Sequence, residues 1–282
     1  MNVADANRNS LCKEGQEVRI AHIDISKRTP SCLTVDQASS GLNDRMIVID
    51  KRFNGPPTSG HGGYVCGLLA QFVDGPAATV RLLLPPPLDT ELEVRETEGG
   101  VVLLDGDVVL AKARPAKVML EPPKCPSYEE AEAASRRYRG FTSHWFSCCF
   151  VCGPDRGPGD GLRVFPGPVE GGELVACPWI PDASVASAGG SVFTEFLWAV
   201  LDCPGSFTFP QPAGEAIVLG EFQAELSGDV SVGEHCVLVA WQIASHGRKH
   251  HTATALFGES GTCLALGLAT FLTVPERAWR QS

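Results

Sequence analysis

Two short segments of this 282-residue chain carry groups that could stabilise or move charge. His61-Gly62-Gly63 opens an apolar helical run, where backbone N–H groups and the helix dipole favour a negative charge. Asp202 ends a second apolar run, where the dipole and burial both raise the pKa of a carboxyl group. Such an acid can act as a general base or a nucleophile, and the two glycine amides could hold an oxyanion.

Cys149-x-x-Cys152, with Cys148 and His144 close by, has the spacing of half a zinc site. A structural zinc ion takes four ligands, usually from two such pairs, and the sequence holds no second pair. We therefore predict a turn with partly buried thiols, no metal and no cofactor. No thioredoxin-like context supports a redox pair, and the Gly-x-Ser-x-Gly pattern of serine hydrolases is absent around Ser191.

Arg248 and Lys249 lie in the densest basic cluster of the chain. They could bind phosphate groups; the alternative is a solvated loop that leads into a strand. Their neighbours His250 and His251 would point to opposite faces of that strand, so they do not easily share one metal ion. Arg163 is a further cation without an assigned partner and a second candidate for an anionic ligand.

Composition limits the classes of partner. The net charge is -10 with a pI near 5.2, which argues against a nucleic-acid or anionic-membrane surface because both need a concentrated positive field. The first twenty residues lack a signal-peptide core, and no stretch reaches the roughly 18 apolar residues of a membrane span. Eleven scattered cysteines fit a reducing compartment. We expect a cytoplasmic protein with no nucleic-acid or membrane partner.

The first half predicts a strand, a helix and then a run of antiparallel strands, which is an α+β order. The helix is expected from His61 to Val73, between a glycine-rich entrance and Gly75-Pro76. A proline-rich connector follows, with a polar helix over 128–137 whose acids come first and bases last. The expected strands are Met46–Asp50, Ala78–Leu84, Leu88–Val94, Val101–Leu104 and Val108–Ala113.

The second half repeats this order with a longer entry, so the chain looks like a weak internal duplication. Its helix is expected over Thr194–Leu201, and its last hairpin, at Ser260-Gly261, stands where Asp105-Gly106 stands in the first half. The expected strands are Leu162–Phe165, Gly172–Ile180, Gly220–Leu226, His235–Ile243, His251–Phe257 and Cys263–Leu272. The predicted units are an N-terminal arm (1–45), a first domain (46–121), a linker with a helix (122–145) and a second domain (146–276).

Asn54, placed seven residues before His61-Gly62-Gly63, completes a pattern that resembles the signature of phenylacetyl-CoA-type hot-dog thioesterases. The segments Cys149–Pro154, Gly159–Arg163 and Trp198–Gly205 resemble uncharacterised double hot-dog proteins of actinobacteria. The resemblance implies a tandem hot-dog fold over about residues 46 to 275. In that fold each half is a curved antiparallel sheet wrapped around a long helix, and joining the two sheets removes an exposed edge from each.

The chain departs from the family pattern at its acid, because the position about nine residues after His61 is Ala70. If the two predicted helices are aligned by their apolar residues, Asp202 takes the acid position and Phe193 stands opposite His61. The chain would then keep one composite site, shared by the two halves, and would have lost its mirror image.

A different alignment sets Gly62-Gly63 against Gly189-Gly190, which places Leu197 opposite Ala70 and leaves the second half without an acid. We favour the first alignment because it preserves the apolar helix pattern.

The resemblance implies that this chain is an acyl-thioester hydrolase acting on acyl-CoA or an acyl-carrier thioester, in which Asp202 activates water. His61 would position the carbonyl group, and Asn54 would orient water or the same oxygen. Both also have structural alternatives, a helix cap and a turn. Arg248 and Lys249 would bind the phosphates of CoA. The rival functions are a hot-dog dehydratase or enoyl-thioester hydratase and a non-catalytic acyl-thioester-binding scaffold. Two copies of the double hot-dog could form a homodimer.

Overall fold

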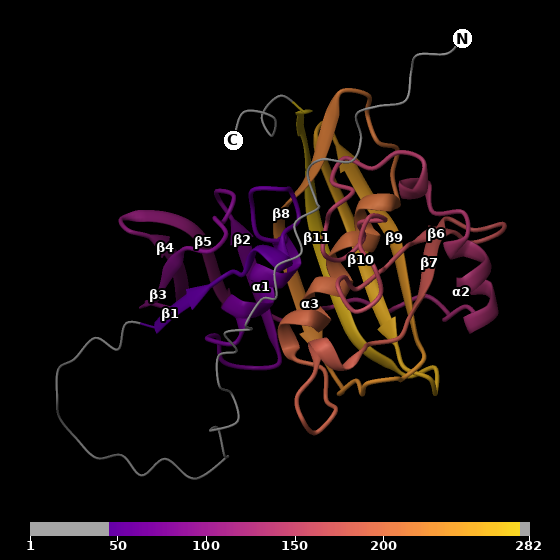
Figure 1. Cartoon of the computed structure of the whole chain (residues 1–282), viewed down its shortest axis with the longest axis horizontal. Helices are drawn as coiled ribbons and strands as arrows, with labels where there is room; N and C mark the ends of the chain where they lie inside the picture. Colours follow the sequence, from indigo (N-terminus) through magenta and orange to yellow (C-terminus); the bar gives the residue numbers. More distant parts are fainter. Residues whose placement is uncertain (1–44, 277–282) are drawn as a thin grey trace. The chain divides into compact units, whose positions relative to one another are not determined.

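The structure is a computed structural model, and it describes residues 45–276. The predicted N-terminal arm, residues 1–45, lies outside the described residues except for Arg45, which begins the first strand. Figure 1 labels the strands and helices of this part of the chain.

The strands of the first half form one side of a single antiparallel sheet, in the spatial order β1-β3-β4-β5-β2. Each predicted strand of this half is present, with its ends shifted by a few residues. Their bounds are β1 Arg45–Val48, β2 Ala77–Leu82, β3 Glu91–Thr97, β4 Gly100–Asp105 and β5 Val108–Pro115.

The strands of the second half continue the same sheet in the order β8-β11-β10-β9-β7-β6. The two halves join edge to edge where β2 pairs antiparallel with β8, and Val80 stands opposite Phe222 at this junction. Both residues are fully buried. The bounds are β6 Gly167–Pro168, β7 Leu174–Trp179, β8 Glu215–Leu226, β9 Cys236–His246, β10 Lys249–Phe257 and β11 Cys263–Pro275.

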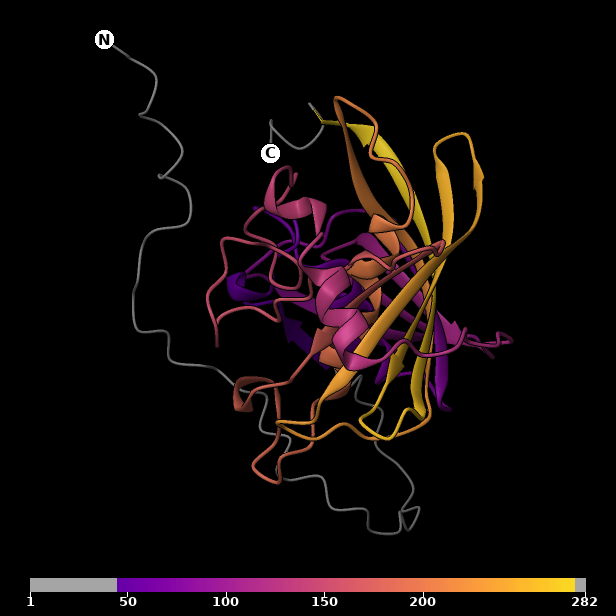
Figure 2. The same ribbon diagram turned by 90° about the vertical axis from the view of Figure 1, so that its right-hand side faces the viewer.

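Two apolar helices, α1 (Gly62–Ala70) and α3 (Thr194–Asp202), pack against each other over this sheet. In the side view the long orange and yellow strands curve on one side of the helices (Figure 2). A polar helix, α2 (Tyr128–Ser135), packs on β7. Ser127 caps α2 in a reciprocal capping box with Glu130, which explains why the helix begins there.

Within residues 45–276, short 3-10 helices occupy four connections between the longer elements. Their bounds are η2 Lys51–Phe53, η3 Arg139–Phe141, η4 Ala183–Val185 and η5 Cys203–Phe207. The helix η5 continues directly from the last residue of α3, and Pro204 stands at its second position, where proline needs no amide hydrogen bond.

Two expectations from the sequence differ from the structure. The long helix expected over His61–Val73 is not confirmed, since α1 ends at Ala70 and both α1 and α3 have nine residues. The strand predicted over Leu162–Phe165 is wrong. Arg163 has a φ of 56°, a left-handed conformation that breaks an extended run, and the backbone there bonds to the loop at Phe150 and Val151 instead.

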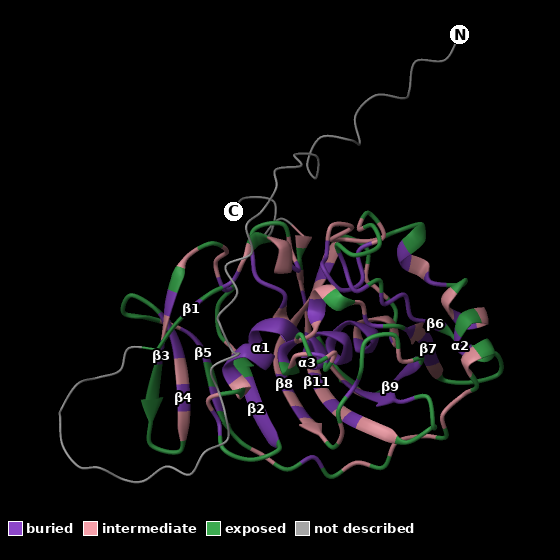
Figure 3. Cartoon of the chain, turned by 60° about the horizontal axis from the view of Figure 1, so that its bottom comes forward, coloured by how far each residue is buried: buried purple, intermediate pink, exposed green. Residues whose placement is uncertain are grey.

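The core lies between the helix pair and the sheet. In Figure 3 α1 and α3 are almost wholly buried, while the exposed residues gather on loops, on α2 and on the outer strands β1 and β3. At the centre, the rings of Phe53, Tyr64, Phe150 and Phe196 contact one another at centroid distances of 4.5–5.9 Å. Aromatic contacts of this kind add to the area that they bury, and here they tie α1 to α3.

Candidate active site

The two buried helices lie antiparallel and in very close contact, because glycines stand where they touch. A Cβ added to Gly63 would lie 2.6 Å from Asp202 Cβ and 2.8 Å from the carbonyl oxygen of Trp198. A Cβ added to Gly67, one turn later, would lie 2.6 Å from Glu195 Cα. The amide-rich start of α1 therefore meets the carboxylate end of α3.

Asp202, the last residue of α3, is buried against the first turn of α1. Its Oδ2 accepts a hydrogen bond from Gly63 N–H at 2.7 Å and lies 3.6 Å from His61 Nε2. Burial raises the pKa of the Asp202 carboxyl group to about 6, although the His61 ring and the Gly63 amide lower it. A carboxyl group of this kind, held by an amide and an imidazole, is typical of a general base.

His61 caps the start of α1, and its Nδ1 accepts a hydrogen bond from Tyr64 N–H at 3.2 Å. In the neutral ring the proton is therefore on Nε2, which lies 3.2 Å from Cys203 Sγ. Burial lowers the pKa of His61, but the nearby Cys149 and Asp202 outweigh it and leave this pKa raised. His61 therefore caps α1, which was the structural alternative considered from the sequence, and it also lies beside Asp202 in the candidate site.

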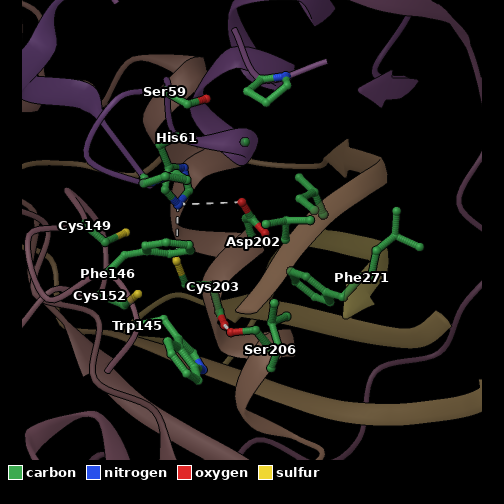
Figure 4. A pocket seen from close by; sticks show the side chains of 18 of the residues that line it. Ser59, His61, Trp145, Phe146, Cys149, Cys152, Asp202, Cys203, Ser206 and Phe271 are labelled. Atoms are coloured by element: carbon green, nitrogen blue, oxygen red, sulfur yellow. Dashed lines mark hydrogen bonds and ion pairs between the residues drawn. The ribbon is translucent and has the colours of Figure 1, made fainter. Parts of the chain in front are cut away.

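A cavity of about 220 Å³ opens beside Asp202 and receives side chains from both halves. Figure 4 shows the carboxylate, the imidazole and three thiols around it, with aromatic rings below. Its walls are mostly apolar, which suits a ligand with an apolar body and a few polar groups. The residues that line it include His61, Gly62, Trp145, Phe146, Asp202 and Phe271.

Asn54 is not among the residues that line this cavity. Its Nδ2 donates to the carbonyl oxygens of Gly55 and Pro56, and its Oδ1 accepts from the Arg156 guanidinium. These bonds occupy both ends of the side chain and hold the loop that precedes His61. The placement favours the turn role over contact with water or substrate.

The three predicted phosphate-binding cations fall in two places. Arg248 and Lys249 are exposed at the turn between β9 and β10, and Lys249 stands opposite Leu272, a residue that lines the cavity. Arg163 is exposed outside the lining, over the ring of Phe165 at 5.1 Å. The structure thus brings the first pair, and not Arg163, near the edge of the cavity.

Two cavity residues were missed by the sequence analysis. Arg139 donates to the carbonyl oxygens of Ser206 and Phe209, and Trp145 stands beside the same wall. Arg139 Nε and Trp145 Nε1 are buried without a hydrogen-bond partner among the described residues. Unpaired donors at a cavity wall suit a ligand with acceptor oxygens. Neither residue belongs to a periodic pattern or a motif that could have indicated this position.

The thiols of Cys149, Cys152 and Cys203 meet at one side of the cavity (Figure 4). The Cys152 and Cys203 thiols lower the pKa of Cys149. The contact with Cys149 raises the pKa of Cys152, and burial raises that of Cys203. Sequence spacing had shown only the first two of these residues, because Cys203 is separated from them by about fifty positions.

No family model matches this chain, and no curated protein matches its sequence. Within residues 45–276, no helix is long and apolar enough to cross a membrane.

Solved structures, in contrast, resemble most of the chain. Acyl-CoA thioesterase II TesB2 from Mycobacterium marinum superposes with a TM-score of 0.52 at 12% identity, covering 85% of this chain and 96% of that one. The tesB protein MAP1729c of Mycobacterium avium subsp. paratuberculosis gives a TM-score of 0.50 at 14% identity, covering 77% and 88%. At such identities the likeness concerns the fold. The chain has a double hot-dog fold, as its sequence resemblance implied.

Proposed function

We propose that this double hot-dog protein hydrolyses acyl thioesters, at one composite site formed by both of its halves. The observation that carries the proposal is the contact between a buried carboxylate, Asp202, and the amide-rich start of α1, beside an apolar cavity. The two solved structures of similar fold are named as a thioesterase II and a tesB protein, which supports the same class of reaction.

In the proposed reaction Asp202 accepts a proton from water while the water oxygen bonds to the thioester carbon. The oxyanion that forms faces the first turn of α1, where Gly62 lines the cavity and the helix dipole favours negative charge. The carbon–sulfur bond then breaks, and the leaving thiolate takes up the proton. His61 acts as a positioning residue that fixes the start of α1 beside the carboxylate.

The mirror-image site lacks the required groups. Phe193 and His61 hold the same N-cap position of α3 and α1, and both helices run for nine residues from there. Ala70 therefore matches Asp202, as the favoured alignment predicted, and offers no acid. The proposal is one hydrolytic site per chain.

The direct test is a panel of acyl-CoA substrates of increasing acyl length, with released CoA measured by chromatography so that protein thiols do not contribute. Release of CoA supports hydrolysis. Loss of enoyl absorbance from an enoyl-CoA without release of CoA would instead show a hydratase. Binding of acyl-CoA with neither reaction would show a scaffold. Light scattering on the same preparation tests the proposed homodimer.

A further prediction concerns the carrier of the acyl group. In the double variant Arg248→Ala/Lys249→Ala, we expect KM for an acyl-CoA to rise about five- to tenfold, because charge-assisted contacts to phosphate are lost. The matched control is the same acyl group on N-acetylcysteamine, which carries no phosphate and should keep its KM. Equal KM changes for both substrates would show that these cations do not bind CoA.

A further inference from the structure

Four buried side chains with metal-binding atoms converge where the two halves meet. Cys149 and Cys152 come from the loop that follows η3, Cys203 follows directly on Asp202 at the end of α3, and His61 caps α1. We call the three cysteines the thiol cluster. His61 Nε2 and the sulfur atoms of Cys149 and Cys203 all lie within 4.8 Å of one another.

Cys152 is the fourth candidate ligand, because its thiol interacts with those of Cys149 and Cys203. It lies outside the set of atoms within 4.8 Å of one another, so its side chain must turn toward them when a metal binds. The turn that carries Cys149 and Cys152 is closed by a hydrogen bond from Gly153 N–H to the carbonyl oxygen of Cys149 at 2.9 Å. Only glycine fits at position 153, since a Cβ there would meet the carbonyl oxygen of Ser147 and the backbone nitrogen of Cys149. Tyr138 O–H also donates to the carbonyl oxygen of Cys152 at 2.8 Å. The loop is thus built to hold two sulfur atoms side by side.

The grouping of His61, Cys149 and Cys203 within 4.8 Å is compatible with a tetrahedral zinc site. With the usual Zn–S and Zn–N bond lengths, two thiolate sulfurs lie about 3.8 Å apart, and a sulfur and an imidazole nitrogen about 3.5 Å apart. His61 Nε2 and Cys203 Sγ are 3.2 Å apart in the structure. Three thiolates and one imidazole are also a donor set that favours zinc over harder cations such as magnesium or calcium.

From this geometry we propose that the thiol cluster and His61 together bind one zinc ion. The three thiols release their protons to solvent when the metal binds. The imidazole keeps one proton, which moves from Nε2 to Nδ1, so the long hydrogen bond from Tyr64 N–H is given up. The start of α1 is then fixed by the metal.

A four-ligand site of this composition is closed and structural. It would join three segments that are distant in sequence: the cap of α1, the end of α3 and the loop after η3. Because Cys203 follows Asp202 directly and His61 precedes Gly62, the metal would set the position of the carboxylate relative to the start of α1. The proposal goes beyond the proposed function and does not require it.

The test is the metal content of the full-length protein, expressed with added zinc and purified under reducing conditions without chelator. We expect about one zinc per chain by mass spectrometry of the elements. Replacement by Co²⁺ should give the visible bands of tetrahedral cobalt and a thiolate-to-metal absorption in the near ultraviolet. Removal of the zinc with a strong chelator should lower the melting temperature, and readdition should restore it.

Variants assign the ligands. Cys149→Ser, Cys203→Ser and His61→Ala should each retain less than about a fifth of the wild-type zinc under a competing chelator, because a four-ligand site loses most of its affinity with one ligand. Cys177→Ser is the matched control, since this cysteine is equally buried in β7 and lies outside the thiol cluster. Circular dichroism identifies any variant that fails to fold. If the variants fail to fold, the cobalt spectrum of the wild-type protein alone decides whether the metal site exists.

Three results would overturn the proposal. The first is wild-type protein that takes up no zinc when reduced. The second is a disulfide between two members of the thiol cluster in freshly purified, metal-free protein, seen as a loss of two hydrogen masses. The third concerns His144, whose Nε2 lies 3.3 Å from Cys152 Sγ. If His144→Ala loses zinc and His61→Ala keeps it, the histidine ligand is His144 and not His61. None of these measurements uses a thioester, so they are independent of hydrolytic activity.

Discussion

The variant Asp202→Asn is expected to lower kcat for thioester hydrolysis by about 10²- to 10⁴-fold, the range attributed to a general base. An amide cannot take a proton from the attacking water. It can still accept the hydrogen bond that Gly63 N–H now donates to Asp202 at 2.7 Å, and its shape is almost unchanged. The helix contact should therefore survive while the chemistry is lost. CoA release under saturating substrate measures the effect.

Glu195→Gln is the matched control for this variant. Glu195 is a second buried acid on α3, its carboxylate accepts from Gln71 Nε2 at 3.1 Å, and it does not line the cavity. Its replacement should leave kcat within about threefold of wild type. Equal losses in both variants would show that removing any buried acid from α3 disturbs the fold. Unchanged activity in Asp202→Asn would exclude this residue as the base.

The duplication into two halves could be predicted from the sequence because it shows in local patterns, whereas the joining of the two sheets was implied by the family resemblance. The expected helices, over 61–73 and 194–201, differed in length, but the alignment of their apolar residues set Asp202 opposite Ala70. In the structure these two residues end helices of nine residues each. The hairpin positions at Asp105-Gly106 and Ser260-Gly261 required glycine in a left-handed turn, and both glycines have positive φ. Helix and turn patterns of this kind involve residues close together in sequence, so they can be recognised without knowledge of the tertiary fold.

The environment of the site could not be predicted in the same way. The spacing of Cys149 and Cys152 resembled half of a zinc site, but the sequence showed no second pair and therefore predicted no metal. The other candidate ligands, His61 and Cys203, come from the cap and the end of two helices far away in sequence. The strand expected over 162–165 failed for a similar reason, because the left-handed Arg163 was set by contacts with the loop at Phe150. Contacts between residues far apart in sequence determine both the grouping of these ligands and the conformation of Arg163, and they cannot be inferred from local sequence patterns.

The helix contact itself gives the second large prediction. Gly67→Ala is expected to destabilise the folded protein by about 2 kcal/mol. The new methyl group would meet the backbone of α3 at Glu195 Cα, 2.6 Å away. Overpacking costs about 1–3 kcal/mol, and we expect the upper end, about 3 kcal/mol, because backbone atoms cannot turn aside as a side chain can. The gain of about 1 kcal/mol that alanine brings to a helix offsets part of this cost. Urea denaturation followed by circular dichroism measures the free energy of unfolding.

The control is Gly172→Ala, since a Cβ at this exposed turn has no neighbour closer than 3.7 Å. It should change the free energy of unfolding by less than about 0.5 kcal/mol. In Gly67→Ala the helices can relieve the clash only by moving apart, which also lengthens the hydrogen bond between Gly63 and Asp202 one turn away. Activity should therefore fall together with stability, although residue 67 does not line the cavity. A stable Gly67→Ala protein with full activity would show that the close approach of α1 and α3 does not position the carboxylate.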